Sequence, residues 1–355
     1  MRKTDVRNLT LRNLEKALVD IGEPRYRAKQ IFSWLYLRNI NDFGDMDNIP
    51  KALRDRIDKL FYISTPAVYK HLKSTDGAEK IVFKLGDGHF VEAVLIYAKN
   101  RKTLCISSQV GCKFACAFCA SGSRGFTRDL SVSEIINQII YLRHDLKCNI
   151  TNYVFMGMGE PLDNYENVTG AIRIMNEPAG MDIGARRITV STCGIIPGIA
   201  RLKGMEPQIN LSISIHAANN KLRDKLMPIN KLYPLEKLIK TCADYMNKTK
   251  RIITFEYVVI KRVNDSSRDA DELAAVARRL KAKVNLIPYS AIPDSGFQPP
   301  QDREIKIFME WLVRKGAKVT LRESKGKDID AACGQLAGGE ESRNNQDRKT
   351  LNPKL

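Results

Sequence analysis

The sequence has no long hydrophobic run. No stretch approaches the roughly 18 consecutive apolar residues that a membrane-spanning helix needs. The beginning of the chain, MRKTDVRNLTLRNLEKAL, also has no apolar core of the kind found in secretory signals. These absences predict a cytoplasmic protein with no membrane partner. In that compartment the eight cysteines are expected to be reduced thiols, metal ligands or catalysts rather than a disulfide framework.

A fourth cysteine is missing from residues 111–122, which read GCKFACAFCASG. Cys112, Cys116 and Cys119 follow the spacing C-x3-C-x2-C, and the chain has no second C-x2-C pair and no H-x3–5-H motif. A structural zinc usually takes four ligands, so zinc here would need a distant fourth ligand such as Cys105. A cuboidal iron–sulfur cluster held by three cysteines leaves one iron open to a substrate or cofactor. The missing cysteine favours a reactive 4Fe–4S site, and zinc is the alternative.

Acidic residues are few compared with basic ones, 40 against 58, which gives a formal net charge of +18. An excess of this size favours a polyanionic partner, and nucleic acid is the commonest. In residues 1–62, apolar side chains recur at helical spacing in LEKALVDI, AKQIFSWLYLRNI and KALRDRIDKLF. We expect these residues to form a small helical accessory domain that carries the cations Arg25, Arg27, Lys29 and Arg38.

The hydrophobic period changes after the helical domain. Residues 63–104 are expected to be a linker and a β-hairpin extension, with Gly86-Asp87-Gly88 as the turn. From 105 to 337, strands and helices alternate in about six βα units, which predicts an α/β fold with a parallel sheet. The cysteine run, MGMGEP, STCG, SIHA and PYSA all follow predicted strands, so they should meet at one mouth. Residues 338–355 are polar and expected to be disordered.

The cysteine motif, with an aromatic residue before its last cysteine and ahead of a βα series, resembles the radical S-adenosylmethionine (SAM) superfamily. Together, the stretches CISSQVGCKFACAFCASG, FMGMGEPLDN, RRITVSTCGIIPGI, LSISIHAAN, LMPINKLYPL and DIDAACGQLAGG resemble the RlmN-type adenine-C2 RNA methyltransferases. The resemblance covers nearly the whole chain. It implies a partial (βα)6 radical-SAM barrel with a small N-terminal helical domain that binds RNA. It also implies one 4Fe–4S cluster, held by Cys112, Cys116 and Cys119, and SAM as both methyl donor and radical source.

The resemblance also implies which residues contact SAM. The MGMGEP motif places the Glu160 carboxylate where it can accept a hydrogen bond from the ammonium of the methionine moiety. After the LIP strand the family usually has an asparagine, whereas this chain has Ser290 in PYSAIP, which is shorter and lacks an amide. The expected cofactor contacts are Gly159, Glu160, Ser191, Ser214, Ile215, His216 and Ser290.

Two further cysteines and one carboxylate match the family's catalytic positions. Cys333 in DIDAACGQL matches the cysteine that takes a methyl group from SAM, a step that suits a thiolate nucleophile. After radical activation by a 5′-deoxyadenosyl radical, that carbon joins adenine C2, which leaves a protein–RNA thioether. Cys105 matches the thiol that resolves this adduct through a transient disulfide with Cys333. Glu92 in FVEAVLIY matches the acceptor of the C2 proton.

Two alternatives compete with this interpretation. The Cfr-type enzymes modify C8 of the same adenine with the same thiols, but their pattern resembles GMGEAL, whereas this chain has GMGEPL. A zinc-stabilised RNA-binding module without catalysis would have no use for Cys333. The expected partners are 23S ribosomal RNA, tRNA and an external electron donor such as flavodoxin or ferredoxin.

Overall fold

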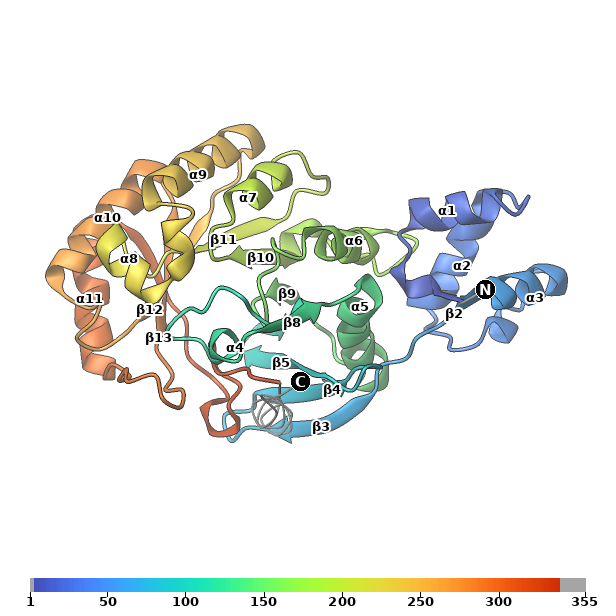
Figure 1. The fold of residues 1–355 in the computed structure, drawn as a ribbon, viewed down its shortest axis with the longest axis horizontal. Helices are drawn as coiled ribbons and strands as arrows, with labels where there is room; N and C mark the ends of the chain where they lie inside the picture. The colour runs from blue at the N-terminus through green and yellow to red at the C-terminus, as the bar shows by residue number, and fades with distance from the viewer. Residues whose placement is uncertain (1–2, 339–355) are drawn as a thin grey trace, which may run out of the picture.

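The main element of the molecule is a ten-stranded sheet with the order β14-β13-β12-β11-β10-β9-β6-β5-β4-β3 (Figure 1). The computed structural model describes residues 3–338, so nearly all of the tail predicted over 338–355 lies outside the described residues. From β6 to β14 every neighbouring pair is parallel. These parallel strands are β6 (Arg101–Cys105), β9 (Asn152–Phe155), β10 (Ile188–Thr192), β11 (Asn210–Ser214), β12 (Thr254–Val259), β13 (Lys283–Pro288) and β14 (Lys318–Leu321).

Helices connect successive parallel strands, so the predicted alternation of six βα units is confirmed (Figure 1). A capping box begins the first of them, α5, because Ser131 Oγ accepts from Glu134 N and the Glu134 carboxylate accepts from Ser131 N. The connecting helices are α5 (Val132–Ile140), α6 (Tyr165–Asn176), α7 (Ile196–Leu202), α8 (Asn220–Leu226), α9 (Leu235–Thr249), α10 (Ser267–Leu280) and α11 (Asp302–Arg314). Short turns of helix are η1 (Val6–Asn8), η2 (Phe43–Asp45), η3 (Tyr141–Asp145), η4 (Ala185–Arg187), η5 (Pro228–Lys231) and η6 (Lys327–Ile329).

An antiparallel extension continues the sheet beyond β6. It consists of β3 (Val68–Lys73), β4 (Glu79–Lys84) and β5 (Phe90–Ala98), and β5 pairs antiparallel with β6. The hairpin predicted at residues 86–88 is confirmed as the β4–β5 turn. Strand β3 was not predicted. It is an edge strand whose residues are mostly exposed, so its sequence does not show the alternation of apolar and polar residues that marks a half-buried strand.

The helical N-terminal domain lies at one end of the molecule (right in Figure 1). It contains α1 (Leu11–Val19), α2 (Tyr26–Tyr36) and α3 (Lys51–Leu60), and the two-residue strands β1 (Thr4–Asp5) and β2 (Phe61–Tyr62). Arg7 fixes this domain to the barrel, because its buried guanidinium donates to Asn39 Oδ1 at 3.0 Å and to Asn137 Oδ1, on α5, at 3.2 Å. Next to it, Ser133 N at the start of α5 donates to Asn8 Oδ1 at 2.8 Å.

The parallel sheet sets where the functional loops lie. The cysteine run follows β6, MGMGEP follows β9, STCG spans the end of β10 and SIHA spans the end of β11. Since carboxyl ends of parallel strands share one edge of the sheet, these loops meet there, as predicted. Within residues 3–338, no helix has both the length and the apolar character needed to cross a membrane.

Candidate active site

The cysteine loop is closed at its base by a short antiparallel ribbon. The ribbon pairs β7 (Gln109–Gly111) with β8 (Phe126–Asp129), and Cys112 N donates to Gly125 O at 2.8 Å. Gly111 has φ +76°, and a Cβ at this position would lie 2.0 Å from Gly125 O. Only glycine fits so close a backbone approach, so the ribbon that folds the loop back on itself depends on Gly111.

The three thiols of this loop face one cavity of about 160 Å³. Burial raises the pKa of Cys112 to about 12 and also raises those of Cys116 and Cys119. A bound metal reverses this preference, because thiols lose their protons when they become ligands. Phe114 and Phe118 line the same cavity and add apolar surface to it. Its other lining residues include Gly159, Glu160, Ser191, Cys193, Ser214, His216, Met156, Glu256 and Cys333.

Glu160 is a buried carboxylate held by backbone amides. Leu162 N donates to Oε1 at 3.0 Å, and Cys193 N donates to Oε2 at 2.7 Å. Burial raises the pKa of Glu160, and these amides oppose the rise. Each carboxylate oxygen has a second lone pair, so Glu160 can still accept from a cationic group in the cavity.

The MGMGEP turn is fastened to the ribbon beneath the cysteine loop. Gly159 has φ +94°, and a Cβ there would lie 2.5 Å from Gln109 Cβ. Glu160 N donates to Gln109 Oε1 at 2.8 Å, and Gln109 Nε2 donates to Asp163 Oδ2 at 2.9 Å. The position of Glu160 relative to the thiols is therefore set by Gln109, a side chain of β7.

His216 lines the cavity as a neutral imidazole. Burial, with a smaller effect of Arg223, lowers its pKa to about 3. Val258 N donates to its Nδ1 at 2.9 Å, so the ring proton is on Nε2. The ring packs edge-on against Phe118 of the cysteine loop, with the centroids 4.6 Å apart. The residue itself is strained, with φ +52°.

Two of the expected cofactor residues do not line this cavity. Ile215 is fully buried, and its N–H donates to Glu256 O at 3.1 Å. Ser290 is buried and forms a hydrogen bond of 2.8 Å with Ser324 Oγ, beyond β14. The other expected contacts, Gly159, Glu160, Ser191, Ser214 and His216, all line it.

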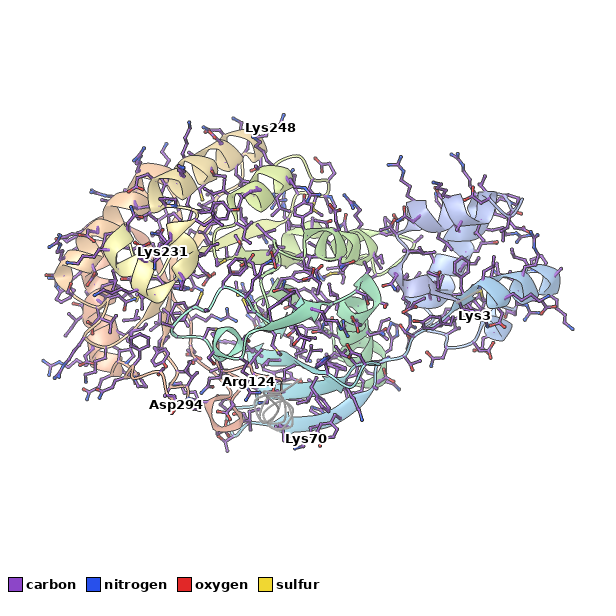
Figure 2. The ribbon with its side chains drawn as sticks, viewed as in Figure 1. Lys3, Lys70, Arg124, Lys231, Lys248 and Asp294 are labelled. Carbon is purple, nitrogen blue, oxygen red and sulfur yellow. The ribbon has the colours of Figure 1, made fainter. Side chains whose placement is uncertain are left out.

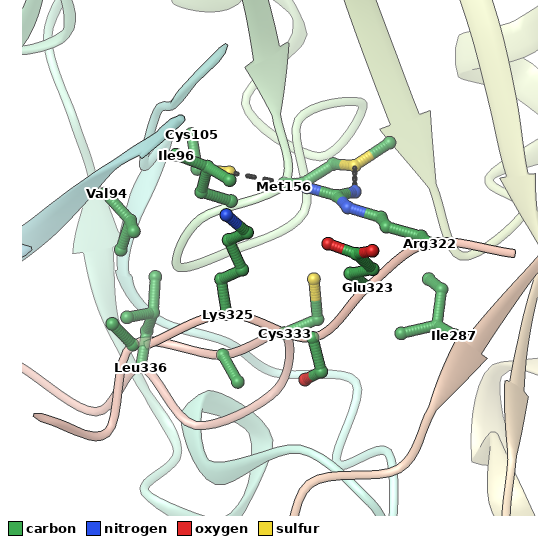
Figure 3. A pocket seen from close by; sticks show the side chains of 13 residues that line it. Val94, Ile96, Cys105, Met156, Ile287, Arg322, Glu323, Lys325, Cys333 and Leu336 are labelled. Carbon is green, nitrogen blue, oxygen red and sulfur yellow. Dashed lines mark hydrogen bonds between the residues drawn. The ribbon is translucent and has the colours of Figure 1, made fainter. Parts of the chain in front are cut away.

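Cys333 reaches the cavity on a segment that is tied to the cysteine loop. Ala120 N, next to Cys119, donates to Gly334 O at 2.7 Å, and Ser121 Oγ donates to Leu336 O at 2.6 Å. Cys333 also lines a second, smaller pocket, which contains Cys105 and Arg322 (Figure 3). It is therefore the cysteine that the two cavities share.

Cys105 ends β6 and lies in this second pocket beside Arg322. The guanidinium donates to Cys105 Sγ at 3.8 Å and to Met156 Sδ at 3.2 Å (Figure 3). Burial raises the pKa of Cys105 to about 11, against the opposing charge of Arg322. Both Cys105 and Cys333 are free thiols in this structure.

Glu92 is buried in β5. Its Oε2 accepts from Ala337 N at 2.8 Å and from Gly338 N at 3.1 Å, and its Oε1 pairs with Lys80 Nζ at 3.4 Å. Without the family resemblance, the alternating pattern would place this side chain in solvent. The carboxylate instead fixes the end of the segment that begins at Cys333.

Comparison with known proteins adds to this geometry. Residues 4–63 match the ribosomal RNA large subunit methyltransferase N-terminal domain, and residues 106–275 match the radical SAM superfamily. The chain is 43% identical, over 95% of its length and 98% of the relative, to a dual-specificity RNA methyltransferase RlmN of Geotalea uraniireducens. It is 44% identical, over 95% and 96%, to the RlmN of Pelobacter propionicus. A solved radical SAM methyltransferase of Sphaerobacter thermophilus matches with a TM-score of 0.88 at 41% identity, over 95% of this chain and all of the other.

The chain belongs to the RlmN family. The partial radical-SAM barrel and the N-terminal domain expected from the sequence are thus confirmed. As a radical SAM methyltransferase, this RlmN-family enzyme uses a 4Fe–4S cluster and SAM.

The residues present fit that cluster. Within residues 3–338, no three His, Cys, Asp or Glu side chains converge as the ligands of one ion would. A cuboidal cluster has no such requirement, because each cysteine binds a different iron. Cys105, the possible fourth ligand of a zinc site, contacts Arg322 in the second pocket. Three thiols on one closed loop, facing a cavity with Glu160, suit a cluster with one open iron.

Arg322, Glu256 and Cys193 are cavity residues that the sequence analysis did not select. Arg322 follows β14, so its place at a strand end was the available signal. Glu256 is a buried acid in an apolar strand, where Asn285 Nδ2 donates to it at 2.6 Å. Cys193, in the STCG stretch, also lines the cavity of the three thiols.

A third cavity, of about 900 Å³, opens inside the barrel toward the amino ends of the strands. It shares Ile96, Met156, Arg322, Glu323 and Lys325 with the pocket of the two thiols. Much of its lining is polar, with Asn152, Asn210, Asn285 and Thr320 among the uncharged groups. The remaining cations that line it are Lys99, Arg101, Arg186 and Lys283.

Proposed function

We propose that this enzyme methylates C2 of adenine in 23S ribosomal RNA and in tRNA. Its relatives in Geotalea uraniireducens and Pelobacter propionicus are dual-specificity RNA methyltransferases, which supports two RNA substrates. The main support for this proposal is the position of Cys333 between two cavities. It lines both the cavity of the cluster cysteines and the pocket of Cys105. A methyl carrier needs this position, because it must take the methyl group on one side and be resolved on the other.

The cofactors supply the methyl group and the radical that activates it. Cys112, Cys116 and Cys119 hold the cluster, and Glu160 accepts from the ammonium of SAM. Gly159, Ser191, Ser214 and His216 line the rest of the SAM site. Ile215, which follows β11, and Ser290, which is bonded to Ser324, lie outside this lining and are not assigned a contact with SAM.

The protein's own chemistry is then divided between two thiols and a carboxylate. Cys333 is the nucleophile that accepts the methyl group, and its sulfur stays bonded to that carbon when the carbon joins adenine. Cys105 resolves the adduct. Glu92 accepts the C2 proton. It is supported in this role by its position two residues before Val94, on the same face of β5, since Val94 lines the pocket of the two thiols.

RNA binding is assigned to the N-terminal domain and to the large cavity of the barrel. Tyr26 is 55% exposed at the start of α2, and Arg27 lies 4.9 Å from its ring centroid. Exposed aromatics beside cations suit the stacking of bases and the binding of phosphates. The polar barrel cavity leads from a cationic rim to the thiol pocket, which suits an extruded adenosine. An external one-electron donor, such as flavodoxin or ferredoxin, completes the set of partners.

The experiment that tests this proposal follows the two thiols separately. Cys333 in the isolated enzyme should carry a methyl group, seen as about +14 Da on its peptide. Cys105→Ala should keep that methyl group, attack RNA and remain covalently bound to it, whereas Cys333→Ala should form no adduct. Cys242→Ala, a buried core thiol, is the control. Normal turnover by Cys105→Ala without trapped RNA would contradict the proposal. Determining whether the product carries the methyl group at C2 or at C8 decides between this proposal and the Cfr-type alternative.

A further inference from the structure

Arg322 lines the second pocket together with both of its thiols, Cys105 and Cys333 (Figure 3). It directly follows β14, and its backbone N–H donates to Leu286 O at 2.9 Å, which fixes the main chain. The side chain then reaches across the barrel, where Met156 Sδ and Cys105 Sγ accept from its two terminal nitrogens. The guanidinium thus has sulfur acceptors at the carboxyl ends of two strands, β6 and β9.

The charge of Arg322 is not neutralised by a carboxylate. In residues 3–338 the guanidinium forms no salt bridge, although Glu256 is near enough to interact at longer range. The thiols are its strongest electrostatic partners, because Cys333 and then Cys105 raise the pKa of Arg322. Lys325 lines the same pocket, but its ammonium is bound to Tyr97 O at 2.8 Å. The charged groups facing Cys105 are therefore Arg322 and, farther away, Glu323, Lys325 and Glu256.

A positive charge beside Cys105 favours the thiolate form, which the resolving step requires. Only a thiolate attacks a sulfur efficiently, and burial works against ionisation of Cys105. Arginine keeps its charge at every physiological pH and cannot act as a base, so its effect on the thiol is electrostatic and geometric. The proton of Cys105 leaves to water through the large cavity, which shares Arg322 in its lining.

We propose that Arg322 is a catalytic residue of the resolving step, which favours the thiolate of Cys105 and orients it toward the sulfur of Cys333. The inference rests on the proposed function. In that step an S–S bond forms between Cys105 and Cys333, and the bond between Cys333 Sγ and the methylene carbon breaks. The electron pair of the broken bond stays on the carbon, which takes a proton from water and becomes the methyl group of the RNA. An external dithiol then reduces the disulfide, and both cysteines return to thiols.

The first test needs no RNA. The anaerobically purified holoenzyme is treated with iodoacetamide across a pH series, and labelling of Cys105 is followed by mass spectrometry. In Arg322→Gln the rate of labelling at a given pH should fall about tenfold, which corresponds to a thiol pKa one unit higher. In Arg322→Lys the rate of labelling should fall less, since lysine keeps the positive charge. Cys148, half-buried and remote from Arg322 in the sequence, is the reference within each protein. An unchanged pH profile of Cys105 in Arg322→Gln overturns the inference.

The second test separates this inference from the proposed function. Arg322→Gln should still carry a methyl group on Cys333 and should accumulate the covalent RNA adduct, as Cys105→Ala does, with partial rescue by Arg322→Lys. If Cys105→Ala traps RNA but Arg322→Gln releases product at the wild-type rate, the role of Arg322 is wrong. If Arg322→Gln has no methyl group on Cys333, Arg322 acts before resolution and the assignment is also wrong. If Cys105→Ala itself traps nothing, the proposed function fails first.

Discussion

The backbone N–H of Ala120 donates to the carbonyl of Gly334 at 2.7 Å, and this bond joins the loop of the cluster cysteines to the segment of Cys333. The two residues are neighbours of Cys119 and Cys333, although more than half of the chain separates them in sequence. Ser121 Oγ and Leu336 O add a second bond at 2.6 Å. The proposed methyl carrier, Cys333, is thus positioned by hydrogen bonds to the loop of Cys112, Cys116 and Cys119.

We expect Gly334→Ala to uncouple the two sites. Gly334 has φ +86°, and a Cβ there would lie 3.0 Å from Phe118 O. Both the backbone and the contact resist a side chain, so the segment of Cys333 should shift. Iron content and SAM binding should be kept, while methylation of the Cys333 peptide falls at least tenfold.

Gly88→Ala is the matched control for that experiment. Gly88 has almost the same φ, +87°, but an added Cβ would meet no atom within 4 Å. Its variant suffers the backbone strain alone. Equal methylation of Cys333 in the two variants would show that strain, and not the contact with the cysteine loop, explains any loss.

The cluster assignment predicts a loss of iron. Cys116→Ala should purify without brown colour and without cleavage of SAM, because a three-cysteine site has no spare ligand. Cys148→Ala, which changes a half-buried thiol outside the cavity, should bind iron and acid-labile sulfide normally. A stable, fully loaded cluster in Cys116→Ala would rule out the assignment of this ligand.

The sequence predicted those parts of the fold that depend on local pattern. The βα alternation, the β4–β5 turn and the capping box at Ser131 each follow from residues within one short stretch. The meeting of the loops at one edge also follows, since parallel strands leave no other arrangement. The cluster loop could also be predicted, because the C-x3-C-x2-C spacing is a local pattern of residues 112–119.

The contacts between distant segments could not be predicted in this way. Arg322 contacts Cys105 only because β14 and β6 curve toward each other across the partial barrel. Glu92 looks like a solvent-facing strand residue until the segment after Cys333 covers it. Ser290 shows the opposite case, since its strand-end position predicts a cavity contact and the structure pairs it with Ser324 instead.

The role of the N-terminal domain in RNA binding is testable through charge. Basic side chains are spread over the whole molecule, with Lys3 on the N-terminal domain, Lys70 on the antiparallel extension and Lys248 on α9 (Figure 2). The proposed function requires Arg25 and Lys29, both exposed near Tyr26, to matter more than the others. Arg25→Glu with Lys29→Glu should weaken RNA binding. The slope of log K against the logarithm of the salt concentration should become smaller in magnitude by about one for each lost phosphate contact.

The control for this pair changes the same number of charges elsewhere. Lys240→Glu with Lys306→Glu alters exposed lysines on α9 and α11, at the outside of the barrel. Its RNA affinity should stay close to that of the wild type at equal salt, and both double variants should cleave SAM normally. Equal losses of affinity in the two would mean that net charge, rather than the N-terminal domain, binds the RNA.

His216 should make the stability of the cofactor-free protein depend on pH. Its pKa is about 3 in the folded chain, because of burial, and near 6.5 when exposed. Between these values the unfolded state binds the additional proton, so the free energy of unfolding should fall as the pH is lowered, by at most roughly 1.4 kcal/mol per pH unit.

Denaturant unfolding at pH 7.5, 5.5 and 4.5 should show a smaller fall in the free energy of unfolding of His216→Gln, which cannot titrate but keeps an acceptor for Val258 N. Equal dependence in His216→Gln and the wild type would mean that other groups cause it, and that the imidazole is not held neutral by the fold.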